Sequence, residues 1–233
     1  MPIPDNLINQ LRGVSTATLT TVLLKHGLRN VWIRGAMELG AVGDRLVAEA
    51  FTLRFVPARE DLATPESWGS PISTRAAIEA MPQGCIAVVD AAGGVSDAGI
   101  FGDILCARMV KRGVAGLITD GVMRDIHGIR DTGLRVFGRG VAAPPSVAGL
   151  TFVAWQEPIG CGGVAVFPGD LIVADADGAV VLPKALVAEI TPKAVEQERF
   201  ENWVMNEVNS GVALPGLYPP DAVTAARYKQ SRS

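Results

Sequence analysis

The chain has 233 residues, of which 48% are hydrophobic and 19% charged, a composition typical of a globular protein. Its net charge of −3, without a basic tract, argues against binding to nucleic acid through the phosphates. No apolar run reaches the ~18–20 residues that cross a bilayer, and the N-terminus lacks the layout of a signal peptide. We therefore expect a cytoplasmic protein with neither a nucleic-acid nor a membrane partner.

The N-terminal third predicts two helical regions around one long strand. Leucine and valine at helical spacing predict helix over residues 5–27, where Ser15 or Thr16 could cap a second helix. The β-forming segment 46–56 predicts a strand, and residues 57–71 read as a polar loop. Ser73 then caps a short helix over 73–81.

The middle of the chain predicts a β-α-β unit. A buried strand over 84–91, a glycine-rich loop, a helix over 104–112 and a strand over 116–119 follow one another. The helix is expected to be mostly buried, because its polar residues form one narrow face. Ligands bind at the carboxyl ends of such parallel strands, so the loops 92–103 and 120–128 should be neighbours.

The last third is predicted to be rich in short strands before it turns helical. Strands are expected at 134–137, 162–167, 171–174 and 179–182, with a tight turn at Asp177-Gly178. A long amphipathic helix should follow over 184–209, and the proline-rich tail 214–222 should be extended. We expect a single α/β domain over 1–233: N-terminal helices at about 5–27, a core at about 28–183, and a C-terminal helix with an extended tail at about 184–233.

Three charged side chains stand at the predicted ligand edge. Asp103 begins the helix that follows the glycine-rich loop, where it could cap that helix or face an anion held by the N–H groups of residues 102–105. Arg124 and Asp125 follow the strand 116–119, either as a surface ion pair or as ligand-binding groups. An arginine fork binds carboxylates, and an aspartate with waters suits Mg²⁺ or Mn²⁺.

Other polar residues are weaker candidates. His127 is read as a surface histidine rather than an acid or base, and Asp97 and Asp120 as turn residues. The three cysteines Cys85, Cys106 and Cys161 should be buried free thiols in a reducing compartment. Without a Cys-x-x-Cys pair or a histidine cluster, a zinc site is not expected.

The spacing Gly102-Asp103, twenty residues, Arg124-Asp125 resembles the signature of the RraA-like family. This family joins the regulator of ribonuclease E activity A to the class II 4-hydroxy-4-methyl-2-oxoglutarate aldolases. The segments 166–170 and 174–178 also resemble the family's β-hairpin, and the resemblance covers residues 19–182. It implies a swivelling β/β/α-type fold, assembled as a homotrimer or homohexamer with active sites between subunits.

The resemblance also implies a site. Asp125 would bind Mg²⁺ or Mn²⁺, Arg124 would bind the pyruvate or oxaloacetate moiety, and Asp103 would position a water molecule at the metal, which makes Arg124 and Asp103 the catalytic residues. Gly102, Asp103, Ile104 and Leu105 would cradle the substrate carboxylate. The activity would be that of a metal-dependent lyase, by retro-aldol cleavage of a 4-hydroxy-2-oxo acid that releases pyruvate, by decarboxylation of oxaloacetate, or by both. Gly128 departs from the pattern, because many aldolases of the family carry an acidic residue there.

Two other functions remain open at this stage. A sugar-acid hydratase or dehydratase could use the same enolate chemistry, and a non-catalytic member could bind and restrain a ribonuclease. Retention of Asp103 and of Arg124-Asp125 favours an enzyme, because a pure binding surface needs no metal ligand.

Overall fold

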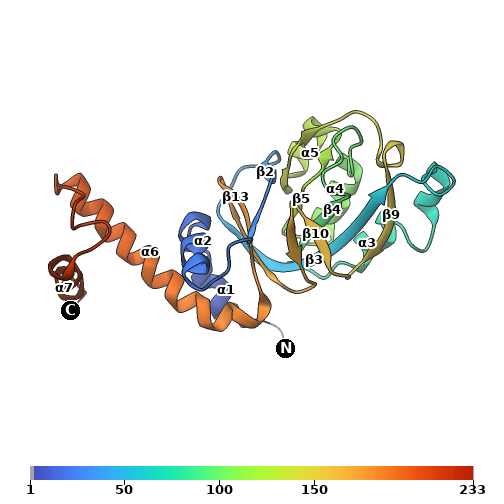
Figure 1. Ribbon diagram of the computed structural model, residues 1–233. Coiled ribbons are helices and arrows are strands. Elements are labelled where there is room, and N and C mark those ends of the chain that lie inside the picture. The colour runs from blue at the N-terminus through green and yellow to red at the C-terminus, as the bar shows by residue number, and fades with distance from the viewer. Residues whose placement is uncertain (1–2, 233) are drawn as a thin grey trace.

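A mixed sheet of nine strands organises the molecule (Figure 1). The structure is a computed structural model and describes residues 3–232, so Met1, Pro2 and Ser233 of the predicted domain lie outside the described residues. The strands of this sheet are β1 (Trp32–Ile33), β2 (Met37–Glu38), β3 (Leu46–Pro57), β4 (Ile86–Ala91), β5 (Gly116–Thr119), β7 (Arg135–Gly138), β9 (Leu150–Trp155), β12 (Leu171–Asp175) and β13 (Gly178–Leu182).

Strand β3 connects the two halves of the sheet. The strands run in the order β1-β13-β12-β3-β4-β5-β7-β2, and β9 also pairs with β3. Pairing is parallel from β3 through β4 and β5 to β7, and antiparallel among β3, β12, β13 and β1. Two small pairs lie outside this sheet: antiparallel β10 (Ile159–Cys161) with β11 (Val164–Val166), and parallel β6 (Val122–Met123) with β8 (Gly140–Val141).

Helices lie in two groups. The described α-helices are α1 (Asp5–Leu11), α2 (Thr16–Lys25), α3 (Thr74–Ala80), α4 (Asp103–Lys111), α5 (Ile126–Thr132), α6 (Val187–Asn209) and α7 (Ala222–Gln230), and the short 3₁₀ turns are η1 (Pro65–Gly69), η2 (Ser146–Ala148) and η3 (Lys184–Leu186). The first group, α3 to α5, covers the parallel strands. The second group consists of the terminal helices α1, α2, α6 and α7. Helix α6 runs away from the body, and α7 folds back at its outer end (Figure 1).

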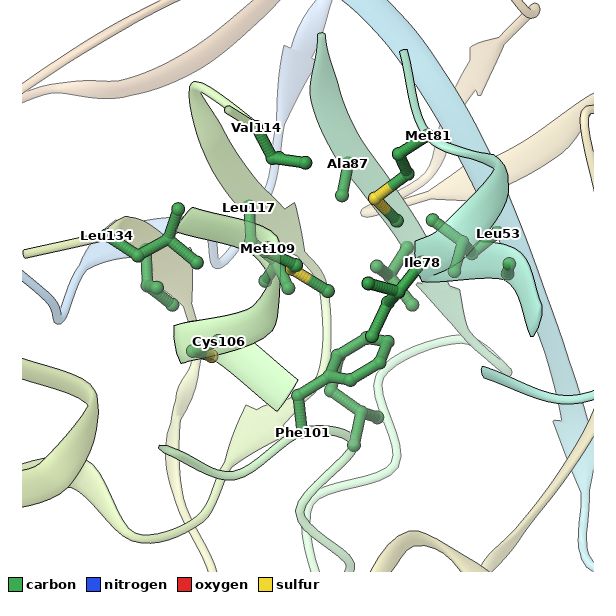
Figure 2. Packing of buried hydrophobic residues seen from close by; sticks show 14 of the residues in the cluster. Leu53, Ile78, Met81, Ala87, Phe101, Cys106, Met109, Val114, Leu117 and Leu134 are labelled. Carbon is green, nitrogen blue, oxygen red and sulfur yellow. The ribbon is translucent and has the colours of Figure 1, made fainter. Parts of the chain in front are cut away.

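The parallel half has a different layer on each face because successive side chains of a strand point to opposite sides. On one face, Leu53, Ala87 and Leu117 pack against Ile78 of α3 and Met109 of α4 (Figure 2). On the other face, the strand residues between them pack against the hairpin β10–β11; they include Ile86, Val88 and Ile118. The result is a helix layer, a sheet and a second β-layer.

The N-terminal and C-terminal helices bury the outer face of β12 and β13. Leu171 and Val173 of β12 contact a cluster that includes Leu19 of α2 and Ile190 of α6, whereas Ile172 and Ala174 face the hairpin side. Burial of a large aliphatic side chain contributes about 1.5–3 kcal/mol. Polar contacts lock the same helices together, since Ser15 caps α2 and its Oγ donates to Glu198 of α6 at 3.1 Å.

Most of the predicted elements are confirmed. The predicted α/β class with helices at both ends, the long strand, the β-α-β unit with parallel pairing, the cap at Ser73 and the hairpin at Asp177-Gly178 are all present. The helical stretch 5–27 is two helices, of which the second is capped by Ser15. The three cysteines are buried free thiols.

Three predictions were wrong. Helix α4 is not mostly buried, because only Cys106 and Met109 are buried along it. Asp103 does not cap α4: Gly102 holds the cap position, and Asp103 is the first helical residue. The tail after α6 is not extended, since residues 214–220 form turns and α7 follows, capped by Asp221.

Between residues 3 and 232, no helix combines the length and apolarity needed to cross a membrane.

Candidate functional site

The two loops predicted to be neighbours are hydrogen-bonded to each other. The Ile100 N–H donates to the Val122 carbonyl at 2.9 Å, and the Arg124 N–H donates to the Phe101 carbonyl at 3.0 Å. These bonds place the end of the glycine-rich loop beside the segment that leaves β5 and β6. The start of α4 and the Arg124-Asp125 dipeptide are thereby brought to the same edge of the sheet.

Glycine permits this close approach. A Cβ at Gly99 would lie 2.7 Å from the Arg124 Cβ and 3.0 Å from the Ala142 carbonyl oxygen. A Cβ at Gly102 would lie 2.6 Å from Oδ2 of Asp125. The distances of 2.7 and 2.6 Å are shorter than real Cβ contacts, so any side chain at Gly99 or Gly102 would push the loops apart. The Asp125 carboxylate therefore rests directly against the backbone that opens α4.

A cavity of about 390 Å³ lies where these loops meet, a size suited to a small-molecule ligand. All the residues predicted for substrate and metal line it, together with others that sequence reasoning did not single out. Its lining consists of Trp68, Arg75, Gly99, Ile100, Gly102, Asp103, Ile104, Leu105, Arg124, Asp125, Pro145 and Ser146.

Arg124 and Asp125 form an ion pair at the wall of this cavity. Nε of Arg124 donates to Oδ2 of Asp125 at 3.1 Å. Their side chains are 33% and 44% exposed, so both remain accessible. Asp125 adopts the left-handed conformation, with φ of 55° and ψ of 43°, which costs a non-glycine residue about 1–3 kcal/mol. Such strain persists where surrounding contacts enforce it, here at the start of α5.

Asp103 has one oxygen engaged locally. Its Oδ1 accepts the Ile104 N–H at 2.7 Å, and Oδ2 has no hydrogen-bond donor within the described residues. Gly128 of α5 lies against this carboxylate, because a Cβ there would be 2.5 Å from Oδ2 of Asp103. The space that an acidic side chain at position 128 would need is thus occupied by Asp103.

The weaker candidates do not join this site. His127 and Asp97 are exposed and are not part of the cavity lining. Asp120 lies in a bend but is buried, and it joins three segments of chain: Oδ1 accepts the Ala91 N–H at 2.8 Å, and Oδ2 accepts the Gly162 N–H at 3.0 Å. Burial raises the pKa of Asp120 above its usual value.

Two residues in the lining come from segments that sequence reasoning treated as a polar loop and a short helix. Trp68 lies in η1 and Arg75 in the first turn of α3, and the Arg75 guanidinium carbon stands 4.6 Å from the centre of the Trp68 ring. No sequence motif links Trp68 or Arg75 to Arg124, so the sequence alone could not identify them as residues of this cavity.

The chemistry of the donor set fits a water-rich magnesium or manganese ion. Within residues 3–232, no group of three or more His, Cys, Asp or Glu side chains could enclose a metal. Mg²⁺ instead binds through one or two carboxylates and keeps several waters. The Asp125 carboxylate is accessible, and its Oδ1 has no hydrogen-bond partner in the described chain. Asp125 therefore meets that requirement.

A family model described as RraA-like, Aldolase/RraA, matches residues 16–181, a span that includes every residue of the cavity lining. The chain belongs to this family. Asp103, Arg124 and Asp125 therefore lie within the segment that matches the family model. The assignment of catalytic, substrate-binding and metal-binding roles to individual residues stays a prediction.

Relatives of known name or structure agree with that membership. The chain is 32% identical over 194 residues to the "Putative 4-hydroxy-4-methyl-2-oxoglutarate aldolase" of Halalkalibacterium halodurans, covering 83% of this chain and 84% of that protein. The crystal structure of Streptomyces coelicolor RraAS2, described as an unusual member of the RNase ES inhibitor RraA protein family, matches with a TM-score of 0.76 at 33% identity and covers 87% of this chain and 97% of its own.

A second solved structure matches over more of the chain. An uncharacterized protein from Pseudomonas syringae pv. tomato has a TM-score of 0.78 at 26% identity, covering 94% of this chain and 99% of that one. These likenesses confirm the predicted RraA-like fold class.

Proposed function

We propose that this RraA-like protein is a divalent-metal-dependent lyase acting on a 2-oxo acid, by retro-aldol cleavage of a 4-hydroxy-2-oxo acid, by decarboxylation of oxaloacetate, or by both. The observation that carries the proposal is that Arg124, Asp125, Asp103 and the start of α4 line one small cavity. The aldolase name of a relative that is 32% identical supports the same reaction class.

In this proposal Arg124 binds and polarises the substrate. Its Nε is held by Asp125, so its terminal N–H groups are directed by a fixed anchor and can bind the carboxylate or the 2-oxo oxygen. Cleavage of the C3–C4 bond leaves the electron pair on an enolate, and a guanidinium placed where that charge develops lowers the barrier. The Ile104 N–H is taken by Asp103, and the other N–H groups at the N-terminus of α4 favour the carboxylate end of the same molecule.

Asp103 handles the proton. In the aldol reaction the 4-hydroxyl group must lose its proton as the C3–C4 bond breaks, and the enolate must gain one to become pyruvate. Asp103 belongs to the cavity lining, and its carboxylate, whose Oδ2 is not bonded to the Ile104 N–H, would accept that proton through a water molecule. In decarboxylation, the electron pair comes instead from the bond to the departing carbon dioxide.

Asp125 is the residue that would hold Mg²⁺ or Mn²⁺. A bound ion there would supply Lewis acidity toward the 2-oxo oxygen and the carboxylate.

The test is release of pyruvate from purified protein, measured with a panel of 4-hydroxy-2-oxo acids and with oxaloacetate. We expect turnover with added Mg²⁺ or Mn²⁺ and its loss after chelation. Arg124→Ala and Asp125→Ala should each lower kcat/KM at least about 100-fold, the order expected for removal of a charged group from the reacting centre.

A matched control is available in Arg59 and Asp61, an exposed arginine–aspartate ion pair away from the cavity, with N–O distances of 2.8 Å. Arg59→Ala and Asp61→Ala should leave turnover unchanged. A metal-loaded protein that is inert on the whole panel, or one whose activity survives both site substitutions, would overturn the proposal.

We propose that the protein assembles as a homotrimer or homohexamer. Ile104 of the cavity lining is 80% exposed, and Val141 of β8, which pairs with Met123 next to Arg124, is 55% exposed. Large exposed apolar side chains near a site favour coverage by another subunit. Light scattering should give a mass of three or six times 24.4 kDa. A monomeric mass at all concentrations would contradict this.

A further inference from the structure

A second cavity adjoins the candidate site. Each of the two has a volume of about 390 Å³. The walls of the second cavity come from the segment 62–74 and from residues of β3, η2 and β9. Trp68 of η1 and Ser146 of η2 are the two described residues that line both cavities.

The boundary between the cavities follows neighbouring residues of the chain. At the start of α3, Thr74 lines the second cavity and Arg75 lines the first. Around Ser146, Val147 lines the second cavity and Pro145 lines the first. The shared residues therefore stand at this boundary, and the indole of Trp68 is the larger of the two side chains.

The indole is held in place from the side of the candidate site. The guanidinium carbon of Arg75 lies 4.6 Å from the centre of the Trp68 ring, which is the distance of a cation–π contact. Trp68 itself is half-buried. A large, rigid ring with such a contact makes a fixed wall rather than a mobile one.

The two cavities differ in chemistry. The first is lined by the charged groups of the candidate site, whereas none of the described residues that line the second is charged. Ser67 Oγ and Ser70 Oγ donate to backbone carbonyls at 2.6 Å, and Thr151 Oγ1 accepts a backbone N–H at 3.0 Å, so these hydroxyls are already bonded within the protein. The largest apolar residues of the second lining are Phe55, Leu62, Ile72, Leu150 and Phe152. This cavity suits an uncharged hydrocarbon group.

We propose that Trp68 limits the chain length of the 2-oxo acids that the candidate site accepts, because it closes the site off from the apolar cavity on its other side. The inference rests on the proposed function, in which Arg124 binds the 2-oxo acid end. A carbon chain that extends from that end toward η1 meets the indole and not the apolar cavity. Removal of the indole would join the two spaces and let a longer chain be buried.

The test measures how affinity depends on chain length. Straight-chain 2-oxo acids of four to ten carbons share the 2-oxo acid group and differ only in the number of methylenes. Binding is measured by calorimetry with Mg²⁺ present, which needs no turnover. We expect the affinity of wild type to stop rising at a chain length within this series. Beyond that length the affinity of Trp68→Ala should go on rising roughly 4-fold per methylene, from burial of about 0.8 kcal/mol each.

Further variants assign the limit to the wall between the cavities. Trp68→Leu shortens the side chain but keeps it apolar, so it should move the limit less than Trp68→Ala does. Phe152→Trp adds volume to the lining of the second cavity, and the double variant Trp68→Ala/Phe152→Trp should return to the wild-type limit. Trp203→Ala is the matched control, because Trp203 of α6 lines neither cavity, and it should keep the wild-type limit.

The outcomes separate this inference from the lyase proposal. Three results overturn the role of Trp68: a wild-type affinity that rises through the whole series, a limit unchanged in Trp68→Ala and Trp68→Leu proteins with intact thermal transitions, or a double variant that binds long chains as Trp68→Ala does. Failure of wild type to bind any member of the series overturns the proposed function and this inference with it. A Trp68-dependent limit in a protein that releases no pyruvate from any substrate supports the role of Trp68 and overturns the lyase proposal instead.

Discussion

Gly128 decides how Asp103 is held. A Cβ at this position would lie 2.5 Å from Oδ2 of Asp103 and 2.7 Å from its Cβ, so an acidic side chain, which the family resemblance led us to expect, has no room here. Two carboxylates in this space would also repel each other. The glycine therefore keeps one carboxylate, rather than two, at this wall of the cavity.

Substitution of Gly128 should damage the site without unfolding the protein. Gly128→Ala needs no unusual backbone angle, yet it forces the Asp103 carboxylate to move. If Asp103 handles the proton, pyruvate release should fall about 10-fold or more, mainly in kcat. Gly160→Ala, where a Cβ would have no neighbour within 4 Å, is the control. Equal kcat for Gly128→Ala and wild type would show that the position of Asp103 does not matter.

Asp120 shows how a structural carboxylate can sit close to a functional one. Its two oxygens accept the N–H groups of Ala91 and Gly162, so they tie β4 and the turn between β10 and β11 to the end of β5. Asp120→Asn replaces one acceptor by an NH₂ donor, and we expect a loss of about 1–3 kcal/mol in the free energy of unfolding, measured by urea denaturation.

The pH dependence of this contribution has a defined sign. Because burial raises the pKa of Asp120 in the folded state, the unfolded chain releases this proton first as the pH rises. Between the ordinary aspartate pKa and the raised pKa of Asp120, the free energy of unfolding of wild type therefore falls as the pH rises. The Asp120→Asn protein lacks this titrating group and does not show that fall. The stability difference between the two proteins should shrink as the pH rises through this window, and a difference that grows would contradict the assignment.

At the scale of elements, the cap of α2 links the two ends of the chain. Ser15 Oγ accepts the Thr18 N–H at 3.0 Å and donates to Glu198 of α6. Ser15→Ala should lower the free energy of unfolding by about 0.5–2 kcal/mol, whereas Ser15→Thr should restore most of it. A chemical denaturation series on the three proteins measures this. Indistinguishable midpoints for wild type and Ser15→Ala would mean that the cap contributes nothing.

Elements with a strong local pattern were predictable. The β-α-β unit follows from an apolar run, a glycine-rich loop and an amphipathic stretch, and this unit alone predicts that Asp103 and Arg124-Asp125 meet. The two-residue strands β1, β2, β6 and β8 were not predictable, because each exists only through a partner far away in the chain. The same reason hides Arg75, whose place depends on how Ala77 and Ile78 of α3 pack on the sheet.

At the scale of the whole molecule, the thiols report on cooperative unfolding. Burial raises the pKa of Cys85 to about 11 and that of Cys106 to about 12, and that of the fully buried Cys161 rises well above its usual value. Below pH 9 these thiols remain protonated and unreactive. We expect labelling by a disulfide reagent at pH 8 to be as slow as global unfolding and to become fast in denaturant. One thiol that reacts at once in the native protein would contradict this.

The helical arm formed by α6 and α7 has a consequence for how the protein moves in solution. The described residues expose 11266 Å², whereas a compact monomer of this mass exposes about 10,000 Å². The excess matches a helix that projects from the body (Figure 1). Such a shape has more friction than a sphere of equal mass, so a single chain should elute early from a sizing column. Elution volume alone would therefore overstate the number of subunits, and a sedimentation velocity experiment would show the arm as a raised frictional ratio.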